Sequence, residues 1–396
     1  MATIRRRTLP SGKIVWQCDY RDQNGARRSK QFERKREADA FLVRARSEVA
    51  QGIHTADSAS STVAEVGELW IKRCEDDGLE ASTVKMYREH LRLHISPLIG
   101  AQKLSRLTMP GVEAFKDQLL ESRSRDMARR VLTSLKGIIK EARRRGLLAQ
   151  NPAEGVTVDL RRSEEEEGEI PSKDHIRAML AKAPEIWPLK KITRGRWVKG
   201  EGRPERHLPQ PWRPLIVTAI FTGMRASELR GLPWANVDLS AGVIRVRQRA
   251  DRWQQIGPPK SRAGRRDIPL APIVVNTLRE WKMACPATAL DLVFPNELGQ
   301  ALTHTNLSRQ GFYPLLKACG LWSKADDAGV YTFHSLRHAA ASLFIEQGWS
   351  PKKVQTVMGH SSIQVTFDIY GHLFPSQEDD REAMAQLQAR LLGAPA

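Results

Sequence analysis

The feature that most constrains the fold is a long stretch, residues 62–150, in which apolar side chains recur at the spacing of an α-helix. Four segments carry apolar residues at i, i+3 and i+4, and only short breaks at Gly78, residues 97–100 and residues 123–124 separate them. Each such segment has one apolar stripe that must be buried against another helix. Residues 62–150 are therefore predicted to form a compact bundle of about four helices.

A different pattern precedes this bundle. Residues 13–20 alternate apolar and polar side chains, residues 22–25 (DQNG) supply a turn, and residues 26–32 have the composition of a second strand. This order predicts a β-hairpin. Residues 36–52 then show helical spacing and end on a glycine, which predicts a helix after the hairpin.

The N-terminal segment, residues 1–52, is strongly basic. It contains 13 basic and 6 acidic residues, a net charge of +7, and Arg27, Arg28 and Lys30 lie near the tip of the predicted hairpin. A solvated basic surface and a small DNA-contacting module both fit this pattern, and we favour the second.

The charge of the whole chain points to a polyanionic partner. Its 396 residues include 63 Lys and Arg against 45 Asp and Glu, a net charge of +18. This excess favours nucleic acid but leaves ribosomal and membrane-surface proteins open. With 41% hydrophobic residues a normal core can form, and no run of ~18 apolar residues predicts a membrane span. The N-terminus has no apolar region typical of a secretory signal.

Cysteine usage favours a reducing compartment. The cysteines are scattered and form no CxxC pair or dense framework, so reduced thiols in a cytoplasmic protein are expected. They are Cys18, Cys74, Cys285 and Cys319.

Two linkers and a larger mixed region are expected around the helical bundle. Residues 53–61 are small and polar, and residues 151–171 include four consecutive glutamates that will stay in water. After them, helical stretches flank a predicted hairpin of residues 242–248 and 258–270, with Ala263 and Gly264 as its turn. In the bundle itself, three consecutive arginines on a polar face are candidate DNA contacts. These are Arg143, Arg144 and Arg145.

Several catalytic motifs are absent from the chain. There is no Walker A loop, no GxGxxG after a strand, no HExxH, no GxSxG and no His/Cys cluster typical of zinc. A basic DNA enzyme without these motifs must stabilise phosphate charge with its own side chains. The search therefore narrows to arginine, lysine and histidine near a nucleophile.

The first candidate segment is FTGMRASELRGL, residues 221–232. Gly223 ends one predicted helix and Arg225 lies at the start of the next, where a side chain and a helix N-terminus can face the same anion. Glu228, three residues later, can orient that arginine. An arginine in such a position is usually a surface residue, so this segment alone decides nothing.

Two further segments follow in the same region. In YTFHSLRHAAASLF, His334, Arg337 and His338 lie at i, i+3 and i+4, so one helical face can present all three. In VMGHSSIQVTFDIYGHLF, His360 follows a glycine turn and Tyr370 lies ten residues later. Each pattern also fits a solvated face or a half-buried core. Their occurrence together, in this order and in a basic chain, is much more specific.

Together these segments resemble the tyrosine recombinases of the phage integrase family. TGMRASEL resembles the first arginine box, HSLRHAAAS the HxxR box, and MGHSSIQVTFDIYGH the block with the second histidine and the nucleophilic tyrosine. PPKSRAGRRDIPL resembles the hairpin that carries the catalytic lysine. The resemblance is dense over residues 212–374, looser over the helical bundle, and weakest over the first 52 residues.

The resemblance implies a role for each matching residue. Tyr370 corresponds to the nucleophile, which attacks the scissile phosphate and forms a 3′-phosphotyrosyl link. Arg225 and Arg337 correspond to the arginines that clamp the non-bridging oxygens, a role that suits the two-pronged guanidinium. Lys260 corresponds to the general acid that protonates the leaving 5′ oxygen.

Supporting roles are implied for the neighbours of these residues. His334 corresponds to the histidine assigned to proton transfer at the nucleophile, and His360 to the one that hydrogen-bonds the phosphate, although either can instead be structural. Glu228 is expected to support the arginine network, and His338 to be a supporting or purely structural residue. Candidate contacts to the DNA backbone near the lysine are Arg262, Arg265 and Arg266.

The implied fold is mainly α-helical with a small antiparallel β-sheet in the catalytic domain. Residues 1–52 are expected to be an arm-type DNA-binding module, residues 62–150 a core-type DNA-binding domain, and residues 171–375 the catalytic domain. The tail, residues 376–396, is expected to be helical from about 377 to 392 and to dock on a neighbouring protomer.

The implied function is site-specific recombination, with integration or excision of a phage or mobile element favoured by the N-terminal module. The implied partners are duplex DNA at attachment sites, three further copies of the chain in a tetramer on DNA, and accessory excision and DNA-bending proteins. No metal and no cofactor is implied. A resolvase or invertase and a DNA-binding regulator on the same fold remain alternatives, and a type IB topoisomerase fits poorly.

One segment departs from the family pattern. Residues 187–214 form a longer connection than usual before the first arginine box, and they are basic and contain Trp187, Trp197 and Trp212. An added DNA contact and an irregular surface insertion are equally consistent with this composition.

Overall fold

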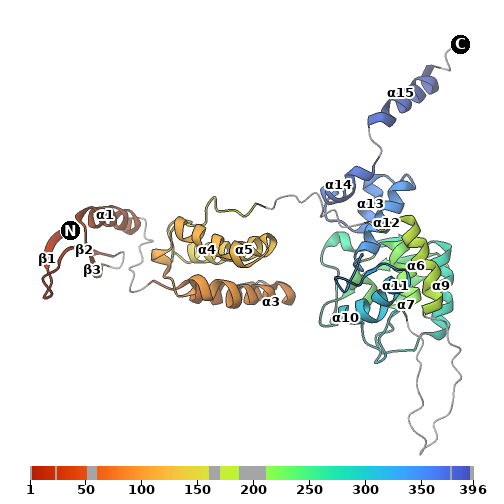
Figure 1. Ribbon diagram of the computed structural model, residues 1–396, viewed down its shortest axis with the longest axis horizontal. Coiled ribbons are helices and arrows are strands. Elements are labelled where there is room, and N and C mark those ends of the chain that lie inside the picture. The colour runs from red at the N-terminus through yellow and green to blue at the C-terminus, as the bar shows by residue number, and fades with distance from the viewer. Residues whose placement is uncertain are drawn as a thin grey trace, which may run out of the picture. The chain divides into compact units, whose positions relative to one another are not determined.

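The chain divides into two units, Met1–Arg162 and Ser163–Ala396, and each is described by itself (Figure 1). No helix in the part described has the length and apolar composition needed to cross a membrane. The computed structural model describes residues 2–22, 25–50, 60–159, 170–186, 211–374 and 377–392.

A three-stranded antiparallel sheet with one covering helix begins the first unit. Strand β2 (Ile14–Arg21) lies between β1 (Thr3–Thr8) and β3 (Arg27–Phe32). Helix α1 (Lys35–Ala50) packs against β2 and β3. The predicted hairpin and helix are present, and β1 is an additional strand. Its sequence, TIRRRT, has one apolar residue and lacks the alternation that identifies β2.

A helical bundle makes up the rest of the first unit. Three of its helices begin at capping residues: Thr62, Thr108 and Ser124 each accept a backbone hydrogen bond from the first turn that follows. The predicted break near Pro97 is instead a π-helical continuation of α3. The elements are α2 (Val63–Asp76), α3 (Ala81–His90), η1 (Leu91–Gly100), η2 (Leu104–Arg106), α4 (Met109–Ser122) and α5 (Arg125–Arg144).

The prediction that residues 151–171 form a solvated linker is wrong for its first part. Ala153, Val156 and Val158 are buried and belong to the same apolar core as α2 and α5. These small and β-branched residues flank Gly155, so their apolar contribution was obscured by the turn residues around them. The four glutamates of this segment, and the predicted linker at residues 53–59, lie outside the described residues.

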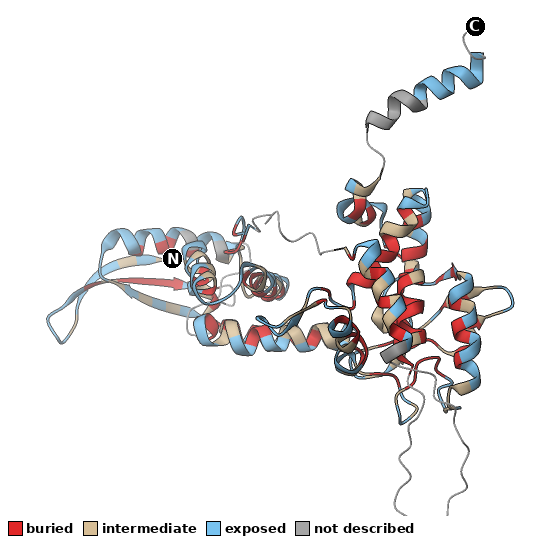
Figure 2. Ribbon diagram, turned by 45° about the vertical axis from the view of Figure 1, so that its right-hand side comes forward, coloured by how far each residue is buried: buried red, intermediate tan, exposed pale blue. Residues whose placement is uncertain are grey.

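The second unit is built around helix α7 (Trp212–Thr222). Nearly every residue of α7 is buried, as expected of a helix that is apolar on all sides. Helices α6 (Lys173–Ile186), α9 (Pro272–Ala284) and α12 (Ser335–Glu346) each pack against it. In Figure 2 the red, buried residues gather where these helices face one another.

Short helices and strands complete this unit. A three-stranded antiparallel sheet has the order β4-β5-β8, and β6 pairs with β7. The helices are α8 (Ala226–Arg230), η3 (Trp234–Asn236), η4 (Arg262–Gly264), α10 (His304–Asn306), η5 (Leu307–Phe312), α11 (Tyr313–Ala318), α13 (Pro351–Met358), α14 (Ile363–Tyr370), η6 (Gly371–Leu373) and α15 (Gln377–Leu392). The strands are β4 (Val237–Asp238), β5 (Val243–Val246), β6 (Arg249–Ala250), β7 (Ile256–Gly257), β8 (Arg266–Pro269), β9 (Trp322–Ser323) and β10 (Ala328–Gly329).

The predicted turn at Ala263 and Gly264 is wrong in position. β5 does pair with β8, as Val246 opposite Arg266 shows, but the chain between them folds back first as a smaller hairpin. That hairpin turns at residues 251–255, where Asp251 accepts hydrogen bonds from two backbone amides. Ala263 and Gly264 instead lie in the short helix η4. The sequence offered two turn signals in one segment, and the first of them is the hairpin turn.

Candidate active site

A buried carboxylate organises the arginines at the start of α8. Glu228 accepts two hydrogen bonds from Arg266, at 3.0 and 2.9 Å, and one from Nη1 of Arg225 at 2.8 Å. The other Glu228 oxygen accepts from the backbone N–H of Arg225 at 2.9 Å and so caps the helix. Burial raises the Glu228 pKa, but the ion pairs with Arg266 and Arg225 outweigh this and hold it below its ordinary value.

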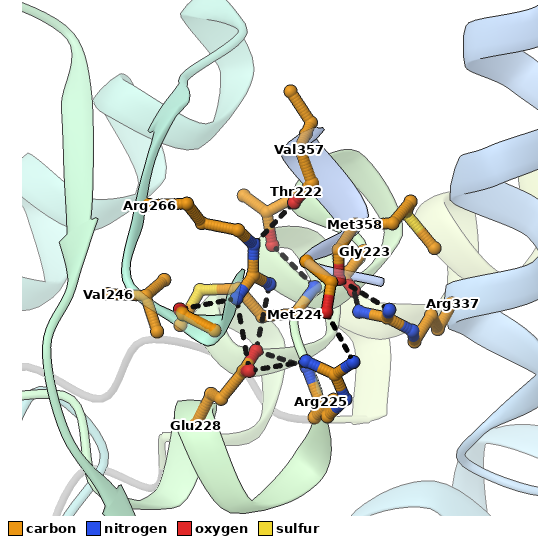
Figure 3. Close-up of polar contacts among 12 residues, drawn as sticks. Thr222, Gly223, Met224, Arg225, Glu228, Val246, Arg266, Arg337, Val357 and Met358 are labelled. Carbon is orange, nitrogen blue, oxygen red and sulfur yellow. Dashed lines mark hydrogen bonds and ion pairs between the residues drawn. The ribbon is translucent and has the colours of Figure 1, made fainter. Parts of the chain in front are cut away.

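Arg337, from helix α12, is buried among backbone carbonyls. Its Nη1 donates to the Gly223 carbonyl at 2.6 Å, and its Nη2 donates to the carbonyl of Met358. Burial first, and then the charge of Arg225, lowers the Arg337 pKa to about 9. The guanidinium therefore keeps its positive charge at neutral pH. Figure 3 shows Arg225, Arg266 and Arg337 converging on one small region from three different elements.

The C-terminal end of helix α13 joins these three arginines. Its last carbonyls, from Val357, Met358 and Gly359, accept from Arg266, Arg337 and Arg225 respectively. Positive side chains at a helix C-terminus are favourable because the unsatisfied carbonyls carry partial negative charge. The arginines thereby fix the position of α13, after which His360 and Tyr370 follow.

Two glycines permit this close approach. Gly223 and Gly359 both have left-handed backbone conformations, with φ of 61° and 67°, and each ends a helix. A Cβ at Gly223 would lie 2.7 Å from the sulfur of Met358, and one at Gly359 would lie 2.9 Å from Nη1 of Arg266. A larger residue at Gly359 would displace Arg266, and one at Gly223 would displace the Met358 side chain.

Tyr370, the last residue of α14, is buried with 1% of its surface exposed. Its hydroxyl is 2.9 Å from Nδ1 of His338 on α12. Burial raises the Tyr370 pKa to about 12, although the nearby charge of Arg337 opposes this rise. The phenol is therefore protonated at neutral pH, and its oxygen lies close to the arginine cluster.

His360 is held in place by α14. Its Nδ1 is 2.9 Å from the hydroxyl of Thr366, which lies one helical turn before Tyr370 on the same buried face. The His360 ring is nearly parallel to the Tyr370 ring, with centroids 6.3 Å apart. Burial and then Arg337 lower the His360 pKa to about 3, so this imidazole is neutral.

His334 lies at the N-terminal end of α12. Its ring meets that of His338 edge to face, with centroids 5.0 Å apart. Desolvation first, and then the neighbouring His338 and Arg337, lowers the His334 pKa to about 4. His334 is therefore neutral and close to the cluster, but the residue bonded to the Tyr370 hydroxyl is His338.

Lys260 lies in the loop between β7 and η4 and is exposed. Partial desolvation of its ammonium lowers its pKa, and the positive charges of Arg249 and then Arg225 lower it further. A lysine with a lowered pKa gives up its proton more readily, as a general acid must. The loop therefore brings Lys260 within electrostatic reach of Arg225.

The structure contradicts the prediction that Arg266 contacts the DNA backbone. Only 2% of its side chain is exposed, and its donors are occupied by Glu228, Gly264 and Val357. The exposed Arg262 and Arg265 beside it remain candidate contacts. The sequence prediction grouped the three because they lie close together in the chain, but Arg266 begins β8, whereas Arg262 and Arg265 lie in η4 and directly after it.

The candidate DNA contacts of the helical bundle differ from one another. Arg143 is exposed, whereas Arg144 and Arg145 pair with the buried carboxylate of Glu141, which also accepts from Arg73. Burial raises the Glu141 pKa, but the hydrogen bonds from its three arginines lower it to about 2. Three arginines around one carboxylate leave a net positive cluster that is partly exposed.

The three cations of the N-terminal hairpin also separate. Arg27 is exposed, Arg28 pairs with the buried Asp22 at 2.8 Å, and the Lys30 ammonium lies 4.8 Å from the centre of the Phe41 ring. Lys30 therefore belongs to the face covered by α1.

The basic insertion is described only at its end. Residues 187–210, which include Trp187 and Trp197, lie outside the described residues, and Trp212 is a buried core residue of α7.

Two residues of the candidate site, Arg266 and His338, were missed or understated in the sequence prediction. Arg266 lies at the centre of the cluster, and the only signal for it was its place within the block that resembles the lysine hairpin. His338 contacts the hydroxyl of Tyr370 directly, and its i+4 spacing from His334 was the signal.

Within the described ranges, no group of three or more His, Cys, Asp or Glu residues could hold a metal ion.

Comparison with known proteins places this arrangement in a family. Residues 207–377 match the model of the phage integrase family, and residues 63–158 match the model of the phage integrase central domain. A XerC-like tyrosine recombinase of Caldanaerobacter subterraneus is 24% identical over 90% of this chain and 91% of its own length. The ICEBs1 integrase of Bacillus subtilis is 22% identical over 79% of each chain.

Solved structures share the fold. The Tn1549 transposon integrase in complex with a circular intermediate DNA superposes with a TM-score of 0.66, at 19% identity, over 83% of this chain and all of that one. A lambda integrase tetramer bound to a Holliday junction superposes with a TM-score of 0.57, at 18% identity, over 90% of this chain and 95% of that one. The two matching models, taken with the buried arginine cluster and Tyr370, lead to one conclusion: the chain belongs to the phage integrase family of tyrosine recombinases.

Proposed function

We propose that this protein is a site-specific DNA recombinase that cuts and rejoins DNA through a 3′-phosphotyrosyl intermediate, and that it integrates or excises a mobile element. The observation that carries the proposal is the Tyr370 hydroxyl, held beside the buried Arg337. The names of the matching proteins support the mobile-element part, because the ICEBs1 and Tn1549 integrases are among them.

The two arginines at this position are suited to bind a phosphodiester. Arg337 keeps its positive charge at neutral pH, and Arg225 has 34% of its side chain exposed. In the proposed reaction they bind the non-bridging oxygens and stabilise the charge that develops in the transition state. Glu228 orients Arg225 without neutralising the cluster, because it is shared with Arg266.

Bond making and breaking are assigned to Tyr370 and Lys260. The Tyr370 oxygen forms a bond to phosphorus, the bond from phosphorus to the 5′ oxygen breaks, and Lys260 supplies the proton that this oxygen takes up. The lowered pKa of Lys260 supports its role as the acid. His360 is assigned a hydrogen bond to the phosphate and His334 a place in proton transfer or in support of the cluster.

The link to Tyr370 retains the energy of the phosphodiester bond, so rejoining needs no nucleotide cofactor. We propose that the reaction needs no metal ion either, because the guanidinium groups supply the positive charge. Cleavage is expected to continue in EDTA at fixed ionic strength. Loss of cleavage in EDTA, restored by a divalent cation, would contradict this part of the proposal.

The proposed partners are duplex DNA at attachment sites and further copies of this chain assembled as a tetramer. A lambda integrase tetramer on a Holliday junction is one of the matching structures and supports this assembly. Accessory excision and DNA-bending proteins, and a cytoplasmic location, are further parts of the proposal. The N-terminal sheet is proposed as the arm-type module, residues 62–150 as the core-type module, and residues 171–375 as the catalytic domain.

Covalent trapping tests the proposed function directly. The protein is incubated with fragmented genomic DNA, denatured in detergent, and the DNA that stays attached is sequenced, with Tyr370→Phe as the control. Enrichment of one site by the unaltered protein alone is the expected result. Ordinary DNA binding without covalent attachment would favour a regulator built on the recombinase fold.

A further inference from the structure

Attack by Tyr370 requires a nearby residue that accepts the proton of its hydroxyl. Before the Tyr370 oxygen can attack phosphorus, its proton must move to a base, since burial raises the pKa of this phenol to about 12. A general base must lie within hydrogen-bond reach of the proton that it takes. Nδ1 of His338 meets this condition, at 2.9 Å from the hydroxyl oxygen.

The other two histidines of the cluster are placed differently. Nδ1 of His360 is bonded to the Thr366 hydroxyl, and its ring is stacked parallel to Tyr370. The His334 ring packs edge to face against the ring of His338. His338 therefore lies between His334 and Tyr370, in direct contact with the reacting oxygen.

His338 is also uncharged before the reaction, which is the state that a general base needs. Desolvation and the adjacent Arg337 both lower the His338 pKa, so its imidazole is neutral and has a lone pair to accept a proton. A neutral imidazole with a free Nδ1 lone pair carries its own proton on Nε2. We assign this tautomer because the protonated phenol is the donor.

We propose that His338 is a catalytic residue: its Nδ1 takes the Tyr370 proton during strand cleavage and returns it during religation. This assignment rests on the proposed recombinase function. In the forward step the O–H bond of Tyr370 breaks, an N–H bond forms on His338, and the oxygen's electron pair forms the bond to phosphorus. The 5′ oxygen leaves with the electron pair of the broken phosphorus–oxygen bond and takes a proton from Lys260. The reverse sequence restores every group.

The neighbouring Arg337 makes this transfer depend on bound DNA. A second positive charge on His338 is unfavourable beside the Arg337 guanidinium while no anion is present. A phosphodiester between Arg225 and Arg337 would offset that charge and favour protonation of His338. The same contact that binds the scissile phosphate would thus activate the nucleophile.

The test combines His338→Asn with a more acidic nucleophile. The asparagine amide oxygen can accept the hydrogen bond of Tyr370 but cannot take its proton at neutral pH. Cleavage is measured on a nicked duplex that contains the site recovered by covalent trapping. We expect His338→Asn to slow covalent attachment about 10²-fold or more, the size typical of lost general base catalysis.

Site-specific replacement of Tyr370 by 3,5-difluorotyrosine then separates proton transfer from positioning. Its phenol loses the proton more easily, so less depends on the base. The ratio of the fluorinated to the unfluorinated rate is taken within each background, so that any loss of folded protein cancels. We expect this ratio to be at least about tenfold larger in His338→Asn than in the unaltered background.

A matched control is available in the same unit. Nδ1 of His175 is 2.7 Å from the Tyr331 hydroxyl, which is the same pair of groups at a position unrelated to the proposed chemistry. His175→Asn is expected to leave cleavage within about twofold of the unaltered rate. His334→Asn, made in parallel, is expected to show no enhanced response to fluorination.

The outcomes separate this assignment from the function on which it rests. Wild-type cleavage with a His338→Asn rate within about threefold of it would overturn the assignment alone. So would a slowed variant whose response to fluorination matches the unaltered background, because that result describes a positioning residue. Absence of any covalent product from the unaltered protein would overturn both the recombinase function and the role of His338.

Discussion

Arg266 binds Glu228 through both terminal nitrogens, at 3.0 and 2.9 Å, with both side chains only 2% exposed. The pair joins β8 to α8, and through the third Arg266 nitrogen it reaches the end of α13. One buried pair therefore connects the strand after the Lys260 loop, the helix that begins at Arg225, and the helix that leads to His360. The pair thereby holds three separate elements of the candidate site in place.

We predict that Arg266→Met destabilises the second unit by about 3–5 kcal/mol, because it leaves a buried carboxylate with too few partners. Urea unfolding measures the change in free energy. Arg265→Met is the matched control, since this neighbour is exposed and its loss should change stability by no more than about 0.5 kcal/mol. Equal stability of the two variants would contradict the structural role of Arg266.

Tyr370→Phe is predicted to abolish strand cleavage and leave DNA binding nearly unchanged. The phenylalanine ring fills the same buried site, and only the hydrogen bond to His338 is lost. That loss is expected to cost about 1 kcal/mol of folding free energy. Binding is measured by gel shift and cleavage by covalent attachment in detergent. A variant that no longer binds DNA would show that Tyr370 is a structural core residue.

Lys260→Ala is predicted to slow cleavage of ordinary DNA by about 10²–10⁴-fold. A substrate with sulfur in place of the 5′ bridging oxygen should restore most of the rate, because a thiolate leaves without a proton. Since desolvation, Arg249 and Arg225 lower the Lys260 pKa, the protonated acid is present below that pKa. Cleavage of ordinary DNA should therefore fall as pH rises through a value below that of an ordinary lysine. The sulfur substrate should not show this fall.

The periodicity of the sequence predicted the helices of the bundle, because their apolar stripes are long and regular. It did not reveal β1, whose exposed arginines give no alternation, nor the burial of Val156 and Val158. Those residues are held by tertiary contacts with a bundle that already exists. A local pattern cannot report such contacts.

For the candidate site, too, the sequence predicted some features and left out those that depend on tertiary packing. Spacing and family resemblance selected residues that the structure brings close together, such as Arg337 and Tyr370. They did not distinguish Arg266 from the exposed Arg265, because the choice depends on which side of β8 faces Glu228. Nor did they show that His338, and not His334, bonds the tyrosine hydroxyl. Both distinctions require the packing of elements that are distant in sequence.

Arg27→Ala is predicted to weaken DNA binding. It should also reduce the slope of log affinity against log salt concentration by the contribution of about one phosphate contact. Arg28→Ala should have a further effect on folding, because Arg28 pairs with the buried Asp22. Binding of a duplex with arm sites is measured between low and moderate salt for each variant. An unaltered salt slope for Arg27→Ala would show that this arginine does not contact phosphate.

Glu141→Gln is predicted to lower the free energy of unfolding of the first unit by about 1–3 kcal/mol, since a neutral amide bonds less strongly to Arg73, Arg144 and Arg145. Because the folded pKa of Glu141, about 2, lies below the ordinary value of 4.5, its stabilising effect is fully present above pH 4.5 and is lost as pH falls towards 2. The difference in unfolding free energy between the two proteins should therefore shrink over that pH range. Urea titrations at a series of pH values measure it, with Glu113→Gln as the control, because the Glu113 side chain is 41% exposed and pairs with Lys116. A difference that stays constant down to pH 2 would contradict the low pKa of Glu141.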